Sequence, residues 1–149
     1  MTTPRDDIEH LIFGYAERID AGDFEGVADL FAHAEITAEG SDQRVVGRDG
    51  VAAMYGSTTR RYPNGTPLTK HVTTNVMVDV DDAAGTATAR SYFTVLQAVP
   101  GELALQPIIA GRYRDHFERA DGVWRFTGRH MVVDLMGDLG HHLLFDLNG

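Results

Sequence analysis

The 149-residue sequence contains no cysteine and few basic residues. Without a thiol it can form no disulfide, no thiolate zinc site and no cysteine nucleophile. Its 13 lysines and arginines stand against 22 aspartates and glutamates, which gives a formal net charge of -9. Such a charge repels phosphate backbones and anionic membrane surfaces, so we expect neither nucleic acid nor a membrane as a partner.

Long apolar runs and phosphate-binding motifs are also missing. No stretch approaches the roughly 20 apolar residues of a membrane span, and the first residues form a polar helix start rather than an apolar signal segment. Glycine-rich phosphate loops and nucleophile elbows do not occur. With 43% hydrophobic residues, the chain has the composition of one ordinary globular domain, residues 1–149, which we expect to be cytoplasmic.

Helical periodicity marks the first part of the sequence. Thr3 followed by Pro4 predicts a helix start, with Asp6 in place to complete a capping box. Apolar residues then recur at three- and four-residue spacing until Gly22, a typical C-terminal stop. Further helices are predicted for residues 23–31 and 49–60, with two short strands, 34–39 and 43–46, between them.

Strand periodicity replaces helical periodicity from residue 69 onward. Four segments are rich in β-branched and aromatic residues and are separated by turn signals, of which Asp121-Gly122 suits a two-residue hairpin turn. Helices followed by successive hairpins predict an α+β fold, with a mostly antiparallel sheet covered by helices on one face. The four predicted strands are residues 69–81, 86–99, 107–119 and 123–136.

Short motifs along nearly the whole chain follow the order and spacing of a known superfamily. They are Leu11–Ala16, Asp20–Phe24, Leu30-Phe31, Gly47-Arg48, His71 with Asn75, Gly111–Tyr113, Asp121–Phe126 and Asp134–Leu139. Together they resemble the SnoaL-like branch of the nuclear transport factor 2-like superfamily. The resemblance implies a conical barrel, also called cystatin-like, in which a curved, mostly antiparallel sheet wraps around the N-terminal helices and leaves a deep pocket. Because that superfamily holds both enzymes and binding modules, the fold alone does not decide the function.

Asp20 and His71 carry a sharper similarity. An aspartate at the end of the first helix and a histidine at the start of the first long strand are typical of the scytalone dehydratase and hexachlorocyclohexane dehydrochlorinase type. A tyrosine five residues before the aspartate occurs in a related bile-acid dehydratase, and Tyr15 stands in that place. The resemblance implies that the histidine removes a proton, that a leaving group departs and that no cofactor takes part. No counterpart of the second catalytic histidine of scytalone dehydratase is identified.

Physical chemistry supports the same pair. A histidine and a carboxylate are the minimum equipment for general-base chemistry at neutral pH. An ionised carboxylate on one imidazole nitrogen fixes the tautomer and stabilises the imidazolium that forms when the other nitrogen takes a proton. We therefore expect His71 to abstract the proton, and Asp20 to orient the His71 ring and tune its basicity. At 100° per residue, however, Asp20 lies about 40° beyond Ala16, at the border of the apolar stripe, so it faces either the site or solvent.

Four further residues are candidates for the site. Tyr15, near the middle of the apolar stripe, is either a core aromatic or a hydrogen-bond donor to a developing enolate oxygen. Strand alternation places Asn75 on the same face as His71. Its side chain is expected either to point into the same cavity or to form a hydrogen bond with a neighbouring backbone group. Arg129 either binds a substrate carboxylate or carbonyl at the pocket mouth or forms a cross-strand surface ion pair. We also count Tyr55, in the third predicted helix, among the substrate contacts.

These residues predict a cofactor-independent lyase, isomerase or cyclase that acts on a small hydrophobic, cyclic molecule of polyketide, steroid or aromatic type. The alternative is a non-catalytic module that binds a small molecule or assembles like a dioxygenase small subunit. Because helices cover only one face of the sheet, we expect a homodimer through the other face. No metal is expected, since Asp134, Asp138, His141 and His142 lack the spacing of a rigid metal site.

Overall fold

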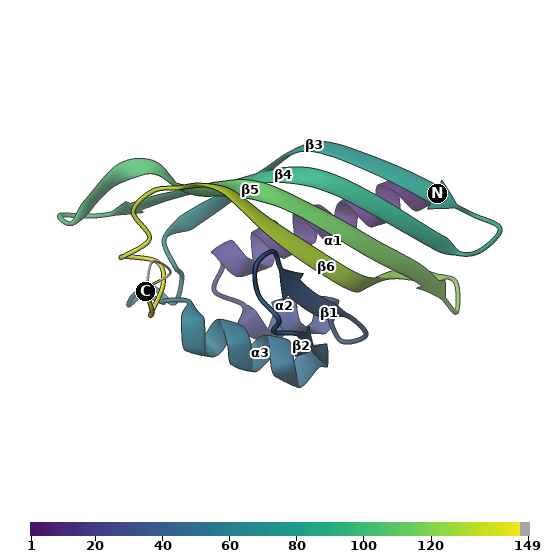
Figure 1. Cartoon of the computed structure of the whole chain (residues 1–149), viewed down its shortest axis with the longest axis horizontal. Helices are drawn as coiled ribbons and strands as arrows, with labels where there is room; N and C mark the ends of the chain where they lie inside the picture. The colour runs from purple at the N-terminus through teal and green to yellow at the C-terminus, as the bar shows by residue number, and fades with distance from the viewer. Residues whose placement is uncertain (147–149) are drawn as a thin grey trace.

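The computed structural model describes residues 1–146 and combines three helices with one six-stranded sheet (Figure 1). The last three residues of the predicted domain lie outside the described part. The elements are α1 (Pro4–Asp20), α2 (Phe24–Leu30), β1 (Glu35–Ala38), β2 (Val45–Val46), α3 (Gly47–Thr58), β3 (Thr69–Asp81), β4 (Thr86–Val99), β5 (Leu103–Ala120) and β6 (Val123–Met136).

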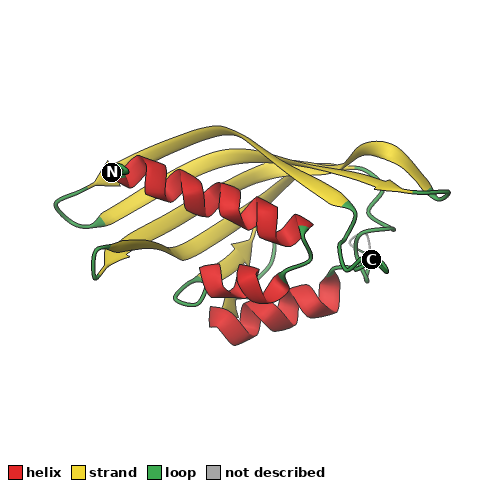
Figure 2. Cartoon of the chain, turned by 180° about the vertical axis from the view of Figure 1, so that it is seen from behind, coloured by secondary structure: helices red, strands yellow, loops and turns green. Residues whose placement is uncertain are grey.

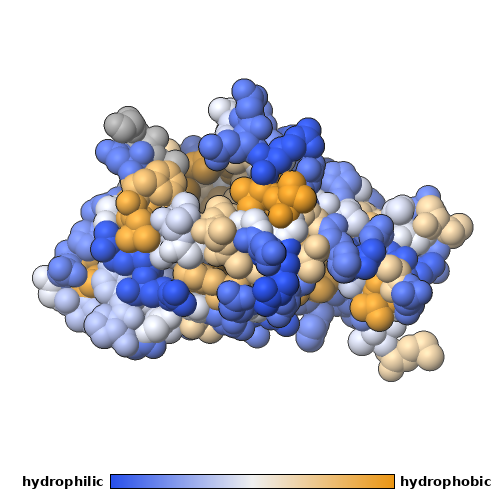
Figure 3. All heavy atoms as spheres, turned by 90° about the horizontal axis from the view of Figure 1, so that it is seen from below, coloured by the Kyte–Doolittle hydropathy of each residue, from blue (hydrophilic) through white to orange (hydrophobic). Residues whose placement is uncertain are grey.

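The sheet is curved and open, with the strand order β2-β1-β6-β5-β4-β3. Neighbouring strands are antiparallel except β1 and β6, which run parallel. All three helices lie on its concave face, with α1 running along the long strands and α2 and α3 beneath (Figure 2). The predicted α+β fold, a mostly antiparallel sheet wrapped around the helices, is confirmed, although the sheet does not close into a barrel. From the helical side the surface is mostly hydrophilic with small separate apolar patches (Figure 3).

The start and end of α1 follow the predicted signals. Thr3 Oγ1 accepts a hydrogen bond from the Asp6 amide at 3.2 Å, and the Thr3 amide donates to Asp6 Oδ2 at 3.0 Å. After the helix ends, Gly22 turns the chain with a φ of +74°. A Cβ atom at Gly22 would lie 1.9 Å from the Gly65 carbonyl oxygen. Glycine therefore allows the end of α1 to press against the loop before β3, which brings Asp20 close to that strand.

The hydrophobic core lies between the helices and the concave face of the sheet. Ile8, Ile12 and Ile19 of α1 are each at most 1% exposed. Phe126 of β6 stacks on Phe31 with ring centroids 4.6 Å apart. Burying one such side chain contributes about 1.5–3 kcal/mol. This packing fixes α1 across the sheet, so the last residue of the helix has a defined place beside β3.

Three of the four long strands have the predicted bounds. The exception is β5, which begins at Leu103 rather than at Pro107. Proline usually ends a ladder because it lacks an amide proton. Here the pairing with β4 is irregular on both sides of Pro107, and these register shifts accommodate it within the strand.

Among residues 1–146, no helix combines the length and hydrophobicity needed to traverse a lipid bilayer.

Candidate active site

The end of α1 meets the start of β3 at a carboxylate and an imidazole, the Asp20–His71 pair. Asp20 Oδ1 lies 2.7 Å from His71 Nδ1, and Asp20 Oδ2 accepts a hydrogen bond from the His71 backbone amide at 2.8 Å. The Thr69 hydroxyl donates a third hydrogen bond to Oδ1 at 2.8 Å. Of the two orientations that the helical pattern left open for Asp20, the structure has the one that faces the site.

Both side chains of the pair are shielded from water, with exposed fractions of 7% for His71 and 11% for Asp20. Burial by itself raises the pKa of Asp20, but the hydrogen bonds from His71 and Thr69 and the charge of a protonated His71 outweigh burial and lower that pKa. Asp20 is therefore ionised at neutral pH. Because a carboxylate only accepts hydrogen bonds, His71 Nδ1 carries the proton and Nε2 is the basic nitrogen.

Three tyrosines from three elements lie on the buried side of this pair. The hydroxyl oxygens of Tyr15 and Tyr55 are 2.8 Å apart. The Tyr15 ring stands edge-on to the rings of His71 and Tyr113, each at a centroid distance of 6.0 Å. Burial raises the pKa of Tyr15 and raises the pKa values of Tyr55 and Tyr113 well above their ordinary value. The hydroxyls therefore stay protonated and can donate hydrogen bonds.

Arg129 lies deep in the structure rather than at a pocket mouth or on the surface. Its guanidinium makes two hydrogen bonds to Asp115, at 2.8 and 3.0 Å, and both side chains are 0% exposed. The guanidinium carbon lies 3.7 Å from the ring centroid of Tyr113 and 4.5 Å from that of Tyr15. The predicted position at the pocket mouth is therefore wrong, and the predicted cross-strand ion pair is present but buried rather than on the surface. The register of β6 against β5 shifts by one residue between Phe126 and Gly128, and this bulge turns Arg129 toward the interior, where Asp115 on the adjacent strand compensates its buried charge.

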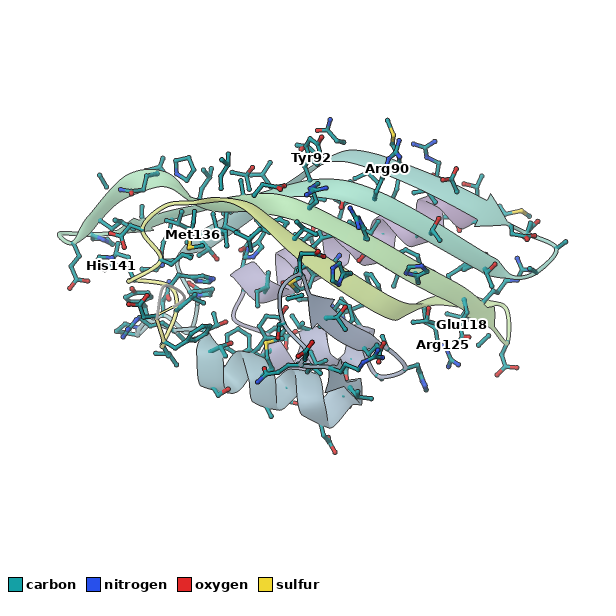
Figure 4. The ribbon with its side chains drawn as sticks, in the orientation of Figure 1. Arg90, Tyr92, Glu118, Arg125, Met136 and His141 are labelled. Atoms are coloured by element: carbon teal, nitrogen blue, oxygen red, sulfur yellow. The ribbon has the colours of Figure 1, made fainter. Side chains whose placement is uncertain are left out.

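Asn75 does not share a cavity with His71. The pairing of β3 with β4 shifts between Thr74 and Met77, and Asn75 has a φ of +54°. Such a bulge inserts one extra residue, so the simple alternation that linked positions 71 and 75 does not apply. Asn75 instead lines a hollow of about 430 Å³ on the outer face of the sheet, next to Arg90 and Tyr92. The side chains of Arg90 and Tyr92 point away from the helices (Figure 4).

His142 is a residue of the site that the sequence pattern did not identify. It is 8% exposed, and its ring centroid lies 6.5 Å from that of His71 at an interplanar angle of 64°. It belongs to the irregular segment after β6, where no periodicity indicates the path of the chain. In the sequence, His142 stands out only because it follows another histidine, His141. Two adjacent histidines do not show where in the fold their side chains lie.

Three of the hollows on the described part of the chain have volumes of about 430–500 Å³, and none of these three has His71 or Asp20 among its lining residues. The largest of these three lies against the segment after β6, next to Arg60 and Leu143. Within residues 1–146 no group of three or more histidine, aspartate or glutamate side chains is placed to hold a metal ion. The Asp20–His71 pair is thus an enclosed base with an ionised carboxylate beside it.

Comparison with known proteins identifies the family. Residues 2–130 match the family model described as a SnoaL-like domain. No curated protein sequence matches the chain. One similar solved structure is an NTF2-like protein with a cystatin-like fold from Novosphingobium aromaticivorans, which is 25% identical, has a TM-score of 0.70 and aligns over 87% of this chain and 80% of its own.

Two further structures share the fold. One is a candidate scytalone dehydratase from Novosphingobium aromaticivorans, which is 23% identical with a TM-score of 0.70 over 90% of this chain and 86% of its own. The other is LinA, which is 23% identical with a TM-score of 0.71 over 91% of this chain and 88% of its own. Since the family model spans most of the sequence and the fold agrees with it, this protein belongs to the SnoaL-like family.

Proposed function

We propose that the protein is a cofactor-independent enzyme in which His71, oriented by Asp20, removes a proton from a small hydrophobic, cyclic molecule. The observation that carries this proposal is the 2.7 Å contact between the Asp20 carboxylate and His71 Nδ1, with both side chains largely buried. Where the dielectric constant is low, an adjacent carboxylate strongly stabilises the imidazolium that forms on proton transfer.

The proposed reaction begins at a C–H bond of the substrate. His71 Nε2 takes the proton, and the electron pair of that bond forms a new double bond. In an elimination, the leaving group departs with the electron pair of its own bond; in an isomerisation, the proton returns to another carbon. In a cyclisation, the enolate carbon attacks a carbonyl carbon of the same molecule, the C=O π electron pair moves to the oxygen, and that oxygen takes up the proton from His71. All three outcomes share this first step, and elimination is the reaction named for the neighbouring candidate scytalone dehydratase.

The tyrosines supply the second part of the chemistry. A protonated Tyr15 or Tyr55 hydroxyl can donate a hydrogen bond to a substrate oxygen that gains negative charge as the proton leaves. The buried Arg129 guanidinium beneath the Tyr15 ring adds positive charge on the same side. Aromatic rings around His71 suit a flat, cyclic substrate better than a flexible polar one.

Proton abstraction can be tested without knowing the natural substrate. We would incubate the protein with 2-tetralone in D₂O and follow deuterium uptake at the carbons next to the carbonyl by mass spectrometry. Wild-type protein is expected to accelerate uptake, and His71→Ala to reduce that acceleration about 10²–10⁴-fold, because the general base is removed. His116→Ala, on the exposed outer side of β5, is the matched control and should behave as wild type. A folded His71→Ala protein with full acceleration would refute the proposal.

A non-catalytic module that binds a small molecule is the second candidate. The observation that favours it is the enclosure of the pair, since side chains only 7% and 11% exposed give a substrate no direct path to His71. A binding module would hold 2-tetralone and yet leave its rate of deuterium uptake unchanged. The exchange experiment therefore separates the two candidates.

We further propose that two copies of the chain associate through the outer face of the sheet. Val72, Tyr92 and Leu135 are 40%, 52% and 70% exposed. The strand register places Val72 and Leu135 in one row across the sheet, joined by Thr94 and Ala110, with Tyr92 one row away. Exposed apolar side chains gathered on one face in this way are typical of an interface, and a two-fold axis would bring the same row of each copy together.

A further inference from the structure

The segment after β6, residues 137–146, folds back toward the end of α3 and is called the C-terminal strap below. His141 lies on this segment (Figure 4). Three donors from outside the strap hold His141 and His142 in place by their backbone carbonyls. The hydrogen bonds run from Arg60 N to His142 O at 2.8 Å, from Gln97 Nε2 to His141 O at 3.1 Å, and from the Tyr62 hydroxyl to the same His141 oxygen.

The strap carries the imidazole of His142 into the site. The residue is 8% exposed, and its ring contacts that of His71 edge-on, with centroids 6.5 Å apart. Within residues 1–146, the buried Nδ1 atoms of His142 and of its neighbour His141 have no hydrogen-bond partner, and of these two rings it is that of His142 that contacts His71. A buried polar atom without a partner is unfavourable in the ligand-free protein, so it requires an explanation. A polar atom of a bound ligand would supply the missing partner.

The charge state of His142 decides what kind of ligand atom it can meet. Burial lowers the pKa of His142 to about 4; a protonated His71 acts in the same direction, and the Asp20 carboxylate opposes both. The imidazole is therefore neutral at pH 7. A neutral imidazole has one N–H donor and one acceptor nitrogen. It can pair with a hydroxyl or a carbonyl oxygen without bringing a second positive charge next to His71.

We propose that His142 is a substrate-positioning residue whose ring forms a hydrogen bond to a hydroxyl or carbonyl oxygen of the bound molecule. This proposal builds on the proposed function, because it takes the space beside His71 as the place where the substrate lies. It also narrows the substrate class to cyclic molecules that carry an oxygen next to the carbon from which the proton is taken. The strap then takes part in selecting the substrate and does more than cover the site.

The experiment compares two ligands that differ by a single hydroxyl group, 2-naphthol and naphthalene. Affinities at pH 7 are measured by fluorescence titration with the whole chain. Wild-type protein is expected to bind 2-naphthol more tightly than naphthalene. His142→Ala should weaken 2-naphthol binding about tenfold, which corresponds to one hydrogen bond, and leave naphthalene binding unchanged. The ¹⁵N signals of the His142 ring should shift on addition of 2-naphthol and not of naphthalene.

His141→Ala is the matched control, because it makes the same change one residue away and keeps the backbone carbonyl that holds the strap. It should bind both ligands as the wild-type protein does. Equal loss of both ligands in His142→Ala would show that the ring only packs, and would overturn the proposal. A wild-type protein that binds neither ligand, or binds the two equally, would overturn it as well. These measurements do not depend on turnover, so their failure is distinct from failure of the deuterium-exchange test.

Discussion

Asp20 performs two tasks with one carboxylate. It accepts hydrogen bonds from the Thr69 hydroxyl and the His71 amide, which join α1 to β3, and it contacts the imidazole that is proposed to act as the base. Loss of its charge therefore affects stability and chemistry together. The stability effect can be measured by itself, because unfolding needs no substrate and its dependence on pH follows the titration of Asp20 in the folded and unfolded chains.

Asp20→Asn is expected to lower the free energy of unfolding by about 1–3 kcal/mol at pH 7, because an amide cannot accept from all three donors. The pKa of Asp20 is lowered in the folded state. Its contribution is therefore complete above the unfolded pKa of about 4 and is lost as the pH falls through the folded value. Urea unfolding from pH 7 to pH 3 should show the two proteins converging toward acid. Asp42→Asn, in an exposed loop, is the control; a difference that is constant with pH would contradict the prediction.

The buried pair of Arg129 and Asp115 gives a second prediction for single residues. Arg129→Met leaves a buried carboxylate without a partner, so the free energy of unfolding, measured by urea denaturation, should fall by about 3–5 kcal/mol. The double variant Arg129→Met, Asp115→Leu removes both charges and should regain much of the loss. Arg5→Met, which breaks an ion pair with a 60% exposed arginine, should cost about 0.5 kcal/mol or less. A double variant as unstable as the single one would contradict this account.

Among the elements, the junction between α1 and β3 determines the geometry of the site. Gly22→Ala should destabilise the protein by about 2 kcal/mol or more, because a Cβ atom there combines a φ of +74° with a 1.9 Å approach to the Gly65 oxygen. The same change should reduce deuterium exchange, because Asp20 is displaced from His71. Urea unfolding measures the change in stability, and the 2-tetralone assay measures the change in deuterium exchange.

Gly101→Ala is the matched control for this junction. Gly101 has a similar φ of +77° but open space around a Cβ atom, so only the backbone strain is added, about 1 kcal/mol. The difference between the two variants measures the close approach alone. Equal losses of stability would show that the contact between Gly22 and Gly65 does not hold the junction.

The elements differ in how far the sequence predicts them, and the reason is the range of the interactions. Caps, turns and strand alternation depend on neighbouring residues, and for that reason the start of α1 and the bounds of β3, β4 and β6 agree with the prediction. The parallel pairing of β1 with β6 joins segments far apart in the chain. Local patterns contain no information about such a pairing.

The same limit applies to the candidate site. Tyr15 and Tyr55 were predicted and lie together. Of the two alternatives for Asn75, the cavity shared with His71 is wrong, because one bulge reverses the alternation of β3. The burial of Arg129 depends on a carboxylate in another strand, and the position of His142 depends on carbonyl contacts of an irregular segment. Each of these is a tertiary contact, which periodicity does not describe.

At the scale of the whole molecule, the proposed dimer predicts that a charge placed in the interface halves the mass of the particle in solution. Wild-type protein at micromolar concentration should sediment as a dimer. Leu135→Asp should give a monomer, because it places a charge in the apolar row on the outer face. Val46→Asp is the control, since Val46 is similarly exposed, at 63%, but lies in β2 away from that row. A wild-type monomer, or a dimer unaffected by Leu135→Asp, would contradict the proposed interface.

The position of β3 at one edge of the sheet has a consequence for aggregation. An unpaired edge strand offers its backbone amides and carbonyls to the edge of another molecule, and repeated pairing of this kind produces fibres. Here the Asp20 carboxylate accepts a hydrogen bond from the backbone amide of His71, so that amide is not available to another strand. Farther along, the bulge at Asn75, whose φ is positive, interrupts the strand. The contact between Asp20 and His71 thereby also protects this part of the edge from pairing with another molecule, and the bulge at Asn75 protects the part farther along.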